Sequence, residues 1–335
     1  MDPLTHGLAS LAMQRGFFPR ASWRSVTTII LAGVVADLDW FSAAFGPWSY
    51  LKWNRTATHS IAFVLLLTVI ALVLSKKVRN NTESAGWSGF SWAAIVAAAS
   101  LHILMDLMQA YPVVPFWPFS GARLWLDIAP AIDPWILTIL AAAILLPELF
   151  RLVGDEIGSR AKRPRGRNGA IVGLSLLILY FGLRTLFHGN TIASLESRTV
   201  GGEMPRRAAA FPDALSPFLW HSIVETESAL NLATMRSMGG DVSYASVLTT
   251  LRKPEPSATL NASQAAPAAI AFLKIARFPK AVVQKETAGF SVEIQDLKDQ
   301  ALNQKDRTIV ADIVIDKSGN VVSSELQWQK NTMHP

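Results

Sequence analysis

Residues 55–74 read RTATHSIAFVLLLTVIALVL, so a histidine, His59, stands directly before an apolar run of membrane-helix composition. Burying a polar group without a partner costs roughly 1–7 kcal/mol, depending on the reference state, so this position predicts a nearby partner for the imidazole. Side chains of matching chemistry lie in or beside other apolar segments, namely His6, Asp37, Asp39, His102 and Asp106. We therefore predict that several segments converge on one metal site.

Composition divides the chain in two. Half of the 335 residues are hydrophobic and 17% are charged, and the apolar residues concentrate in the first 190 positions. This asymmetry predicts a polytopic membrane domain over residues 1–189 and a soluble domain over residues 190–335. The net charge is +6, but the basic residues mostly punctuate the apolar segments, so we expect no nucleic-acid partner. The absence of cysteine excludes disulfides and thiolate metal ligands.

Hydropathy predicts a membrane α-helical bundle of about five spanning segments after a short N-terminal helix. The short helix covers about residues 3–14 and opens with Pro3, which suits a first turn. The expected spans cover residues 25–46, 59–75, 89–110, 131–150 and 169–188. Between the third and fourth spans, residues 111–127 contain three prolines, which predict a shaped loop instead of a helix.

The C-terminal region has the pattern of a small α+β domain. Residues 310–315 and 321–328 flank a glycine-containing turn, which predicts a β-hairpin. Residues 281–294 are rich in strand-forming residues, and Trp220–Val224 is a further candidate strand. Residues 264–275 are predicted to form a helix. Pro267 is compatible with this prediction, because proline is tolerated in the first turn of a helix.

The Lys and Arg content of the connectors predicts the orientation of the protein in its membrane. Connectors 15–24, 76–79 and 151–167 hold 3, 3 and 6 of these residues, against 2 in residues 47–58 and 1 in residues 111–127. The richer connectors should face the cytoplasm, so we expect the C-terminal domain on the extracytoplasmic side. Counted by helical rise, the candidate site residues then all fall in the outer half of the bilayer.

Spacing indicates how the site residues share one ion. His102 and Asp106 are four residues apart and project from one helix face, so both can bind the ion, or Asp106 can orient the imidazole. Asp37 and Asp39 can both face one site only if their helix unwinds there; otherwise one of them acts through another ligand. Histidine and aspartate without cysteine suit Zn²⁺, with Mn²⁺ or Fe²⁺ as alternatives.

Three further residues are candidates for catalysis. Arg55 can hold a phosphate by its planar fork, and Asp127 or Asp133 can handle a proton. Asp133 also has a structural interpretation, because aspartate suits an N-cap and Pro134 the first turn of a helix. In the same way, Thr58 is a reasonable N-cap for the apolar helix that follows it.

Several motifs occur together and in order: Met1-Asp2-Pro3-Leu4-Thr5-His6, Asp37-Leu38-Asp39, Arg55–Ser60, Leu101–Asp106, Trp117-Pro118-Phe119-Ser120 and Leu126–Trp135. With them the chain resembles the YdjM-type inner-membrane metal-dependent hydrolases of bacteria, most strongly over residues 1–150. That family is distantly similar to zinc-dependent phospholipase C and the S1/P1 nucleases, which are helical and hold zinc in His/Asp clusters. The resemblance implies that the metal ligands are His6, Asp37, Asp39, His59, His102 and Asp106.

The favoured function is hydrolysis of a phosphoester, or of another ester, by metal-activated water. A site in the outer leaflet suits a lipid or envelope precursor whose tail stays in the bilayer, so we expect such a substrate. Two alternatives remain. A proton-coupled transporter would use the same side chains as a relay, and a non-enzymatic membrane anchor would bind a partner through its C-terminal domain.

Overall fold

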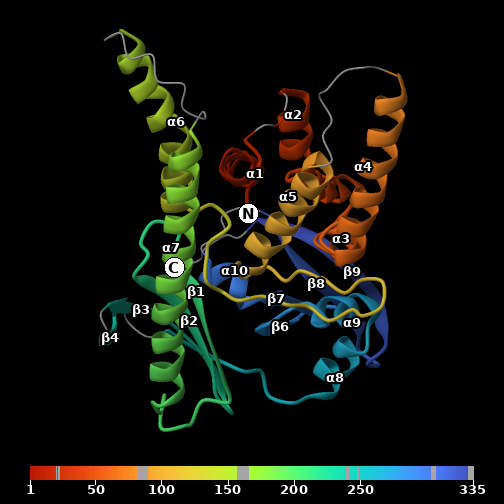
Figure 1. The fold of residues 1–335 in the computed structure, drawn as a ribbon. Helices are drawn as coiled ribbons and strands as arrows, with labels where there is room; N and C mark the ends of the chain where they lie inside the picture. The colour runs from red at the N-terminus through yellow and green to blue at the C-terminus, as the bar shows by residue number, and fades with distance from the viewer. Residues whose placement is uncertain are drawn as a thin grey trace. The chain divides into compact units, whose positions relative to one another are not determined.

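The computed structural model describes residues 1–19, 21, 23–81, 90–156, 166–238, 241–246, 249–302 and 307–330. The chain forms two compact units, Met1–Ser42 with Trp53–Thr185 and Ala43–Lys52 with Leu186–Pro335. The first unit is helical, and the second is built mainly from antiparallel strands (Figure 1). The units divide near Thr185, whereas we expected a boundary after residue 189, and residues 43–52 fall with the C-terminal unit.

The helical unit follows the predicted order of apolar segments. Its elements are α1 (Pro3–Phe17), α2 (Trp23–Ala32), most of the 3-10 helix η1 (Val35–Phe45), α4 (Ile61–Asn81), α5 (Phe90–Leu107), α6 (Pro134–Glu156) and the larger part of α7 (Arg167–Glu196). The N-terminal helix opens with Pro3 in its first turn, as predicted, and the Asp2 side chain caps it by accepting the backbone N–H of Thr5. Residues 111–127 form no helix, which confirms the predicted loop.

The prediction of five spans is not supported. Among the described residues, only Pro134–Leu152 and Arg167–Glu196 are long and apolar enough to cross a membrane alone, and α2 with η1 would make a third span bent by 47°. The other apolar helices, Ile61–Val73 and Trp92–Leu107 in this measure, have at most 17 residues. These apolar stretches are shorter than the spans expected over residues 59–75 and 89–110. Seventeen helical residues extend about 25 Å, less than the ~30 Å hydrocarbon core.

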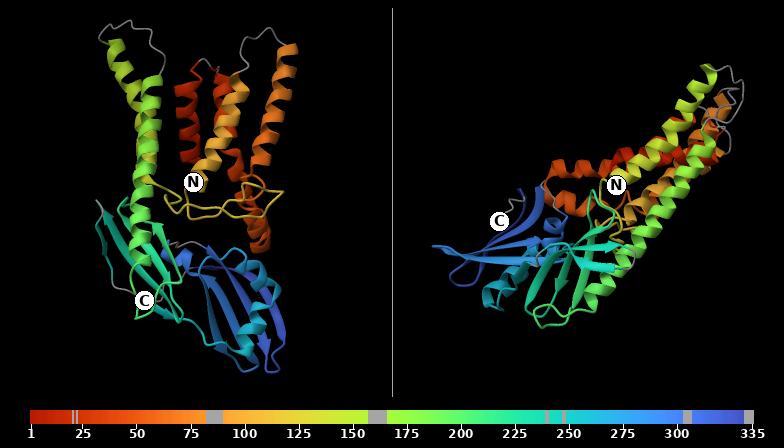
Figure 2. Two further views of the ribbon diagram at one scale, coloured as in Figure 1. Left: turned by 60° about the horizontal axis from the view of Figure 1, so that its bottom comes forward. Right: turned by 90° about the vertical axis from the view of Figure 1, so that its left-hand side faces the viewer.

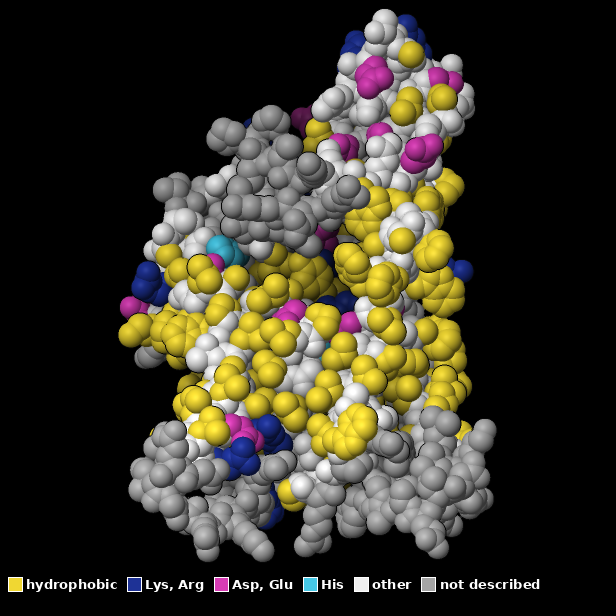
Figure 3. All heavy atoms as spheres, turned by 90° about the horizontal axis from the view of Figure 1, so that it is seen from above, with side chains coloured by type: hydrophobic (Ala, Val, Ile, Leu, Met, Phe, Trp, Pro, Cys, Tyr) yellow, Lys and Arg dark blue, Asp and Glu magenta, His cyan; other side chains and the backbone are white. Residues whose placement is uncertain are grey.

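Much of the described surface of the helices is nevertheless hydrophobic. In the space-filling view, hydrophobic side chains gather across the middle of the face that it shows, and polar and charged side chains gather at one end (Figure 3). Long apolar side chains of both spanning helices are exposed, including Leu145, Leu149, Phe150, Ile178 and Leu179. A soluble monomer seldom exposes a contiguous apolar surface of this kind, so the helical unit has the surface of a membrane protein.

The helices α6 and α7 approach closely at two glycines (Figure 2). A Cβ atom added at Gly169 would overlap the side chain of Pro147, and one added at Gly173 would overlap the side chain of Ala143. The two glycines are four residues apart, which is the small-xxx-small spacing that lets membrane helices pack backbone to backbone. The glycine pair therefore fixes the contact between the two helices that are long enough to span.

The C-terminal unit contains two antiparallel sheets. The first has the order β1-β2-β3-β4, with β5 also paired to β3: β1 (Arg207–Pro212), β2 (Leu219–Glu225), β3 (Ala229–Met238), β4 (Asp241–Tyr244) and β5 (Thr249–Arg252). The second has the order β6-β7-β8-β9: β6 (Pro279–Lys285), β7 (Gly289–Asp296), β8 (Arg307–Asp316) and β9 (Val321–Lys330). Its helices are α3 (Pro47–Trp53, mostly in this unit), α8 (Ala258–Gln264), α9 (Pro267–Leu273) and α10 (Leu297–Ala301).

The predicted elements of this unit are present. The hairpin is β8 with β9, and the Asp316 carboxylate accepts the backbone N–H of Asn320 (2.8 Å) across its turn. Residues 281–294 lie in β6 and β7, Trp220–Val224 lies in β2, and Pro267 opens α9. Strands β1, β3, β4 and β5 were not predicted. Strand β1 is rich in alanine, which is not a strand-favouring residue.

The glycine contact can be tested with a matched pair of substitutions in α7. We predict that Gly173→Leu lowers the free energy of unfolding by about 1–3 kcal/mol, which is the usual cost of overpacking. Gly182→Leu should not lower it, because a Cβ atom at Gly182 meets nothing within 4 Å. Both variants gain the same helix propensity, so thermal unfolding in one detergent isolates the packing effect. Equal stability of the two variants would contradict the close approach.

Candidate metal centre

Four side chains from three elements of the helical unit converge. His6 comes from α1, Asp37 from η1, and His102 and Asp106 from α5. One nitrogen or carboxylate oxygen of each lies within 4.8 Å of the corresponding atoms of the other three. His6, His102 and Asp106 are buried, and the Asp37 side chain is 17% exposed. All four residues were predicted from the sequence, including the pairing of His102 with Asp106 on one helix.

A break between α2 and η1 positions part of this cluster. The chain turns through Gly33 and Val34 between these helices. A Cβ atom added at Gly33 would overlap the Ser10 side chain of α1, so only glycine allows this approach. The Gly33 carbonyl oxygen lies 2.8 Å from His102 Nδ1. The break therefore supplies a backbone acceptor that orients one imidazole of the cluster.

This acceptor fixes the protonation of His102. A carbonyl oxygen only accepts hydrogen bonds, so the Nδ1 of His102 carries a hydrogen and, in the neutral ring, Nε2 presents a lone pair. That Nε2 lies 3.7 Å from Asp37 Oδ1 and 3.7 Å from Asp106 Oδ2. A lone pair thus faces two carboxylates across distances too long for hydrogen bonds. Metal-ligating histidines commonly have this arrangement, with the second ring nitrogen donating to a carbonyl oxygen.

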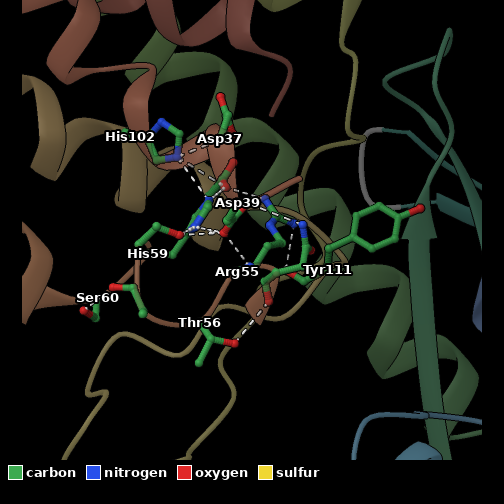
Figure 4. A network of polar contacts seen from close by, with 12 residues as sticks. Asp37, Asp39, Arg55, Thr56, His59, Ser60, His102 and Tyr111 are labelled. Carbon is green, nitrogen blue, oxygen red and sulfur yellow. Dashed lines mark hydrogen bonds and ion pairs between the residues drawn. The ribbon is translucent and has the colours of Figure 1, made fainter. Parts of the chain in front are cut away.

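His59 meets the cluster from the loop before α4 (Figure 4). Its Nδ1 lies 3.0 Å from Asp39 Oδ2, so this nitrogen donates its hydrogen to the carboxylate. Its Nε2 lies 2.9 Å from Asp106 Oδ2 and 3.2 Å from His102 Nε2. The Thr58 hydroxyl donates a further bond to Asp39 Oδ2 (2.6 Å). Asp39 therefore orients His59, while Asp37 lies in the cluster itself.

This division answers the question that the spacing of the two aspartates left open. The aspartates lie on a 3-10 helix instead of a regular α-helix, and the helix break precedes them. Asp37 belongs to the four-residue cluster, whereas Asp39 does not. Their side chains serve neighbouring imidazoles, since Asp37 faces His102 and Asp39 faces His59.

The donor set fits a divalent cation. Imidazole nitrogens and carboxylate oxygens are the ligands of Zn²⁺ and similar ions, and they converge here in a buried space. Two buried atoms of the cluster, His6 Nδ1 and Asp37 Oδ2, have no hydrogen-bond partner among the described residues. The Nε2 atoms of His59 and His102 approach to 3.2 Å; because the Nδ1 atom of each ring carries a hydrogen, this approach needs either a second proton on one ring or an ion that both nitrogens bind.

Arg55 lies against the same carboxylate. Its guanidinium contacts Asp106 Oδ2 (2.5 Å) and donates to the backbone carbonyl oxygen of Tyr111 (3.1 Å) and to Gln109 Oε1 (3.4 Å). Its backbone N–H donates to Asp39 Oδ2 (2.7 Å), from a left-handed conformation with φ of 56°. The side chain is 13% exposed. One predicted catalytic residue therefore borders the cluster.

The two other catalytic candidates lie in different surroundings. Asp133 caps α6, because its carboxylate accepts the backbone N–H groups of Trp135 (2.9 Å) and Ile136 (3.2 Å). Its second oxygen accepts the Tyr180 hydroxyl (2.8 Å), so the structural interpretation of Asp133 accounts for these contacts. Asp127 is buried with a φ of 57° and is not one of the four clustered residues. Catalytic roles for both remain predictions.

The predicted cap at Thr58 is wrong. Helix α4 begins at Ile61, and Ser60 is the residue whose hydroxyl accepts the backbone N–H of Phe63 (3.2 Å). Thr58 lies too early in the chain to cap this helix, and its hydroxyl contacts Asp39 and the Nδ1 of His59 instead.

Two contacts to the central carboxylate were not predicted. Gln109 donates to Asp106 Oδ1 (2.6 Å), and the Met1 amine also contacts that oxygen. The spacing of Gln109, three residues after Asp106, carried a signal that it shares the helix face, although α5 ends at Leu107. No comparable signal pointed to the chain terminus, because its approach depends on how α1 packs against α5.

The profile of the YdjM inner membrane protein family matches residues 1–191. The chain belongs to this family. The matched region contains every residue of the candidate centre and one whole span, with most of α7. Searches of curated proteins and of solved structures gave no match. Membership of the YdjM family thus confirms a membrane protein and leaves its chemistry to the geometry of the cluster.

The two aspartates of η1 offer a matched test of the centre in this YdjM protein. Asp37→Ala removes a cluster carboxylate, so it should abolish measurable Zn²⁺ binding. Asp39→Ala should weaken binding by about 10–100-fold, as expected when a residue orients a ligand without touching the ion. Titration calorimetry of the purified full-length proteins gives both affinities, and circular dichroism checks their folding. A larger loss for Asp39→Ala than for Asp37→Ala would contradict the division of roles.

Proposed function

We propose that this protein is a membrane-bound, metal-dependent hydrolase that acts on a phosphoester, or on another ester, of a lipid or envelope precursor. The observation that carries the proposal is the buried convergence of His6, Asp37, His102 and Asp106. Ionisable groups inside membrane helices are costly, at least ~2.5 kcal/mol each on insertion scales, and usually mark function. His59 and Arg55 stand at the same carboxylate, so the group has both ligand-type and anion-binding side chains.

Zn²⁺ is the ion that these residues suit best, with Mn²⁺ or Fe²⁺ as alternatives. His6, Asp37, His102 and Asp106 would hold it, and His59 would complete or border the set. Such an ion lowers the pKa of a coordinated water and polarises a phosphoryl oxygen. The contacts of Asp39 and of the Gly33 carbonyl oxygen keep two imidazoles in one orientation, which an ion site requires.

Arg55 would bind the phosphate of the substrate. An ion pair with Asp106 holds its side chain in place, and the side chain is also partly exposed. Some of the five N–H donors of the guanidinium can therefore reach a ligand. Gln109 and the Tyr111 carbonyl oxygen restrain the guanidinium from the other side. The left-handed backbone at this residue turns the chain so that the backbone N–H and the side chain address two different carboxylates.

The orientation of the protein also remains a proposal. The C-terminal unit would be extracytoplasmic, because the connectors richest in Lys and Arg lie at the C-terminal ends of α1, α4 and α6 or just beyond them. The basic residues of the third connector, except Arg151 and Arg167, and Arg20 of the first lie outside the described residues. Support for this orientation therefore comes from the sequence.

One observation favours an enzyme over a proton-coupled transporter. A relay distributes its ionisable groups through the bilayer, because protons pass from one side to the other. Here the ionisable side chains gather around one carboxylate, which suits a single ion and its water. An anchor without chemistry gives no reason for buried, unpartnered ligand atoms such as Asp37 Oδ2.

Activity in detergent tests the proposal. The purified protein should hydrolyse phosphoesters from a panel of lipid and nucleotide substrates, lose this activity with a chelator and regain it with Zn²⁺ or Mn²⁺. His59→Ala should be inactive with its fold retained, because it removes the imidazole that faces Asp106 Oδ2. A metal-loaded protein that hydrolyses nothing in the panel but moves protons in liposomes would contradict the proposal and favour the transporter.

A further inference from the structure

The loop between α5 and α6 has a buried base and an exposed apolar tip. Its base, residues 112–115 and 127–130, is buried, and almost all of residues 116–126, here called the loop tip, are exposed. Residues 116–122 of the tip contain no charged side chain. Phe119 is 92% exposed, and the other large apolar side chains exposed in the tip are Phe116, Trp117, Leu124, Trp125 and Leu126.

Hydrogen bonds give the loop tip a defined shape. The backbones of Val113 and Leu124 exchange two bonds (3.0 and 2.9 Å) that close its base. The carbonyl oxygen of Phe116 accepts the N–H groups of Phe119 (2.9 Å) and Ser120 (3.1 Å). Such bonds fix a turn, so the apolar side chains are held outward by the backbone instead of collapsing onto the protein.

The base of the same loop is bonded to the candidate metal centre. The backbone N–H of Val114 donates to the Arg55 carbonyl oxygen (3.1 Å), and the Tyr111 carbonyl oxygen accepts from the Arg55 guanidinium (3.1 Å). The Pro115 carbonyl oxygen accepts the N–H of Ile61, the first residue of α4 (2.9 Å). The tip is therefore attached to the centre by a few residues of ordered chain.

The surroundings of the loop tip indicate what covers it. The loop leads directly into α6, whose spanning segment starts at Pro134, and the exposed residues Ile132 and Trp135 flank that start. A second exposed apolar edge lies on η1, where Leu38, between the two aspartates, and Trp40 are exposed (56% and 64%). Aromatic side chains at the end of a spanning helix are typical of the boundary between hydrocarbon and headgroups.

We propose that the loop tip inserts into the lipid headgroup region of the bilayer, with Phe119 as its deepest side chain. Leaving six large apolar side chains in water is unfavourable, since each gains free energy when its apolar surface is removed from water. Lipid removes them from water without a second protein, and the adjacent spanning segment places them at its level. For the proposed hydrolase, the substrate would then reach Arg55 from the bilayer; this consequence rests on that function, whereas the lipid contact does not.

The absence of cysteine in the sequence allows a direct test. Phe119→Cys and, as a matched control, Ser318→Cys in the exposed turn after β8 each place one spin label on the full-length protein. The protein is reconstituted in vesicles of phosphatidylethanolamine and phosphatidylglycerol. Power-saturation measurements then compare the access of oxygen, which partitions into lipid, with that of a water-soluble nickel chelate. We expect oxygen to dominate at position 119 and the chelate to dominate at position 318.

Two results would overturn the proposal. Equal access of the chelate to both labels would place the loop tip in water. Shielding of the label at position 119 from both reagents would mean that protein covers it, either the C-terminal unit or another chain. Neither measurement depends on metal content or on hydrolysis, so a failure here is distinct from a failure of the proposed enzymatic function.

Discussion

The Asp106 carboxylate is the group on which the arrangement of the helical unit depends. It is fully buried, and an isolated buried carboxylate costs several kcal/mol unless charged or hydrogen-bonding partners surround it. The chain supplies such partners from distant segments, namely the Met1 amine, His6, Arg55 and His59, and from nearby Gln109. Removing the negative charge of Asp106 would leave the Met1 amine, the Arg55 guanidinium and the histidine rings facing one another without an acceptor. The Asp106 side chain therefore holds these segments together.

The irregular parts of the helical unit all direct polar groups toward the Asp106 cluster or toward the imidazoles around it. The break after α2 exposes the Gly33 carbonyl oxygen to His102, and η1 turns its two aspartates toward different imidazoles. The left-handed residue Arg55 directs its backbone N–H and its guanidinium to two carboxylates. Regular helices could not direct these groups to one place, so the departures from regular structure occur where the ligand-type atoms gather.

Much of the cluster was predictable because ionisable side chains in apolar segments carry a cost that demands partners. That cost alone identifies four of the residues and predicts that they converge: His6, Asp37, His102 and Asp106. The separate role of Asp39 was not predictable, since it depends on the 3-10 conformation and on the loop that holds His59. The structure supports fewer spans than hydropathy predicted, and strands β1, β3, β4 and β5 were missed, because residue preferences do not determine how alanine-rich and polar segments pair.

We propose that the Asp106 cluster holds a divalent cation. Anomalous diffraction at the zinc absorption edge, from crystals of the full-length protein grown with Zn²⁺, tests this claim most directly. We predict one anomalous peak among the side chains of His6, Asp37, His102 and Asp106, within bonding distance of the His102 Nε2. Well-ordered density for these side chains with no peak between them, or with ordered water in its place, would contradict the claim.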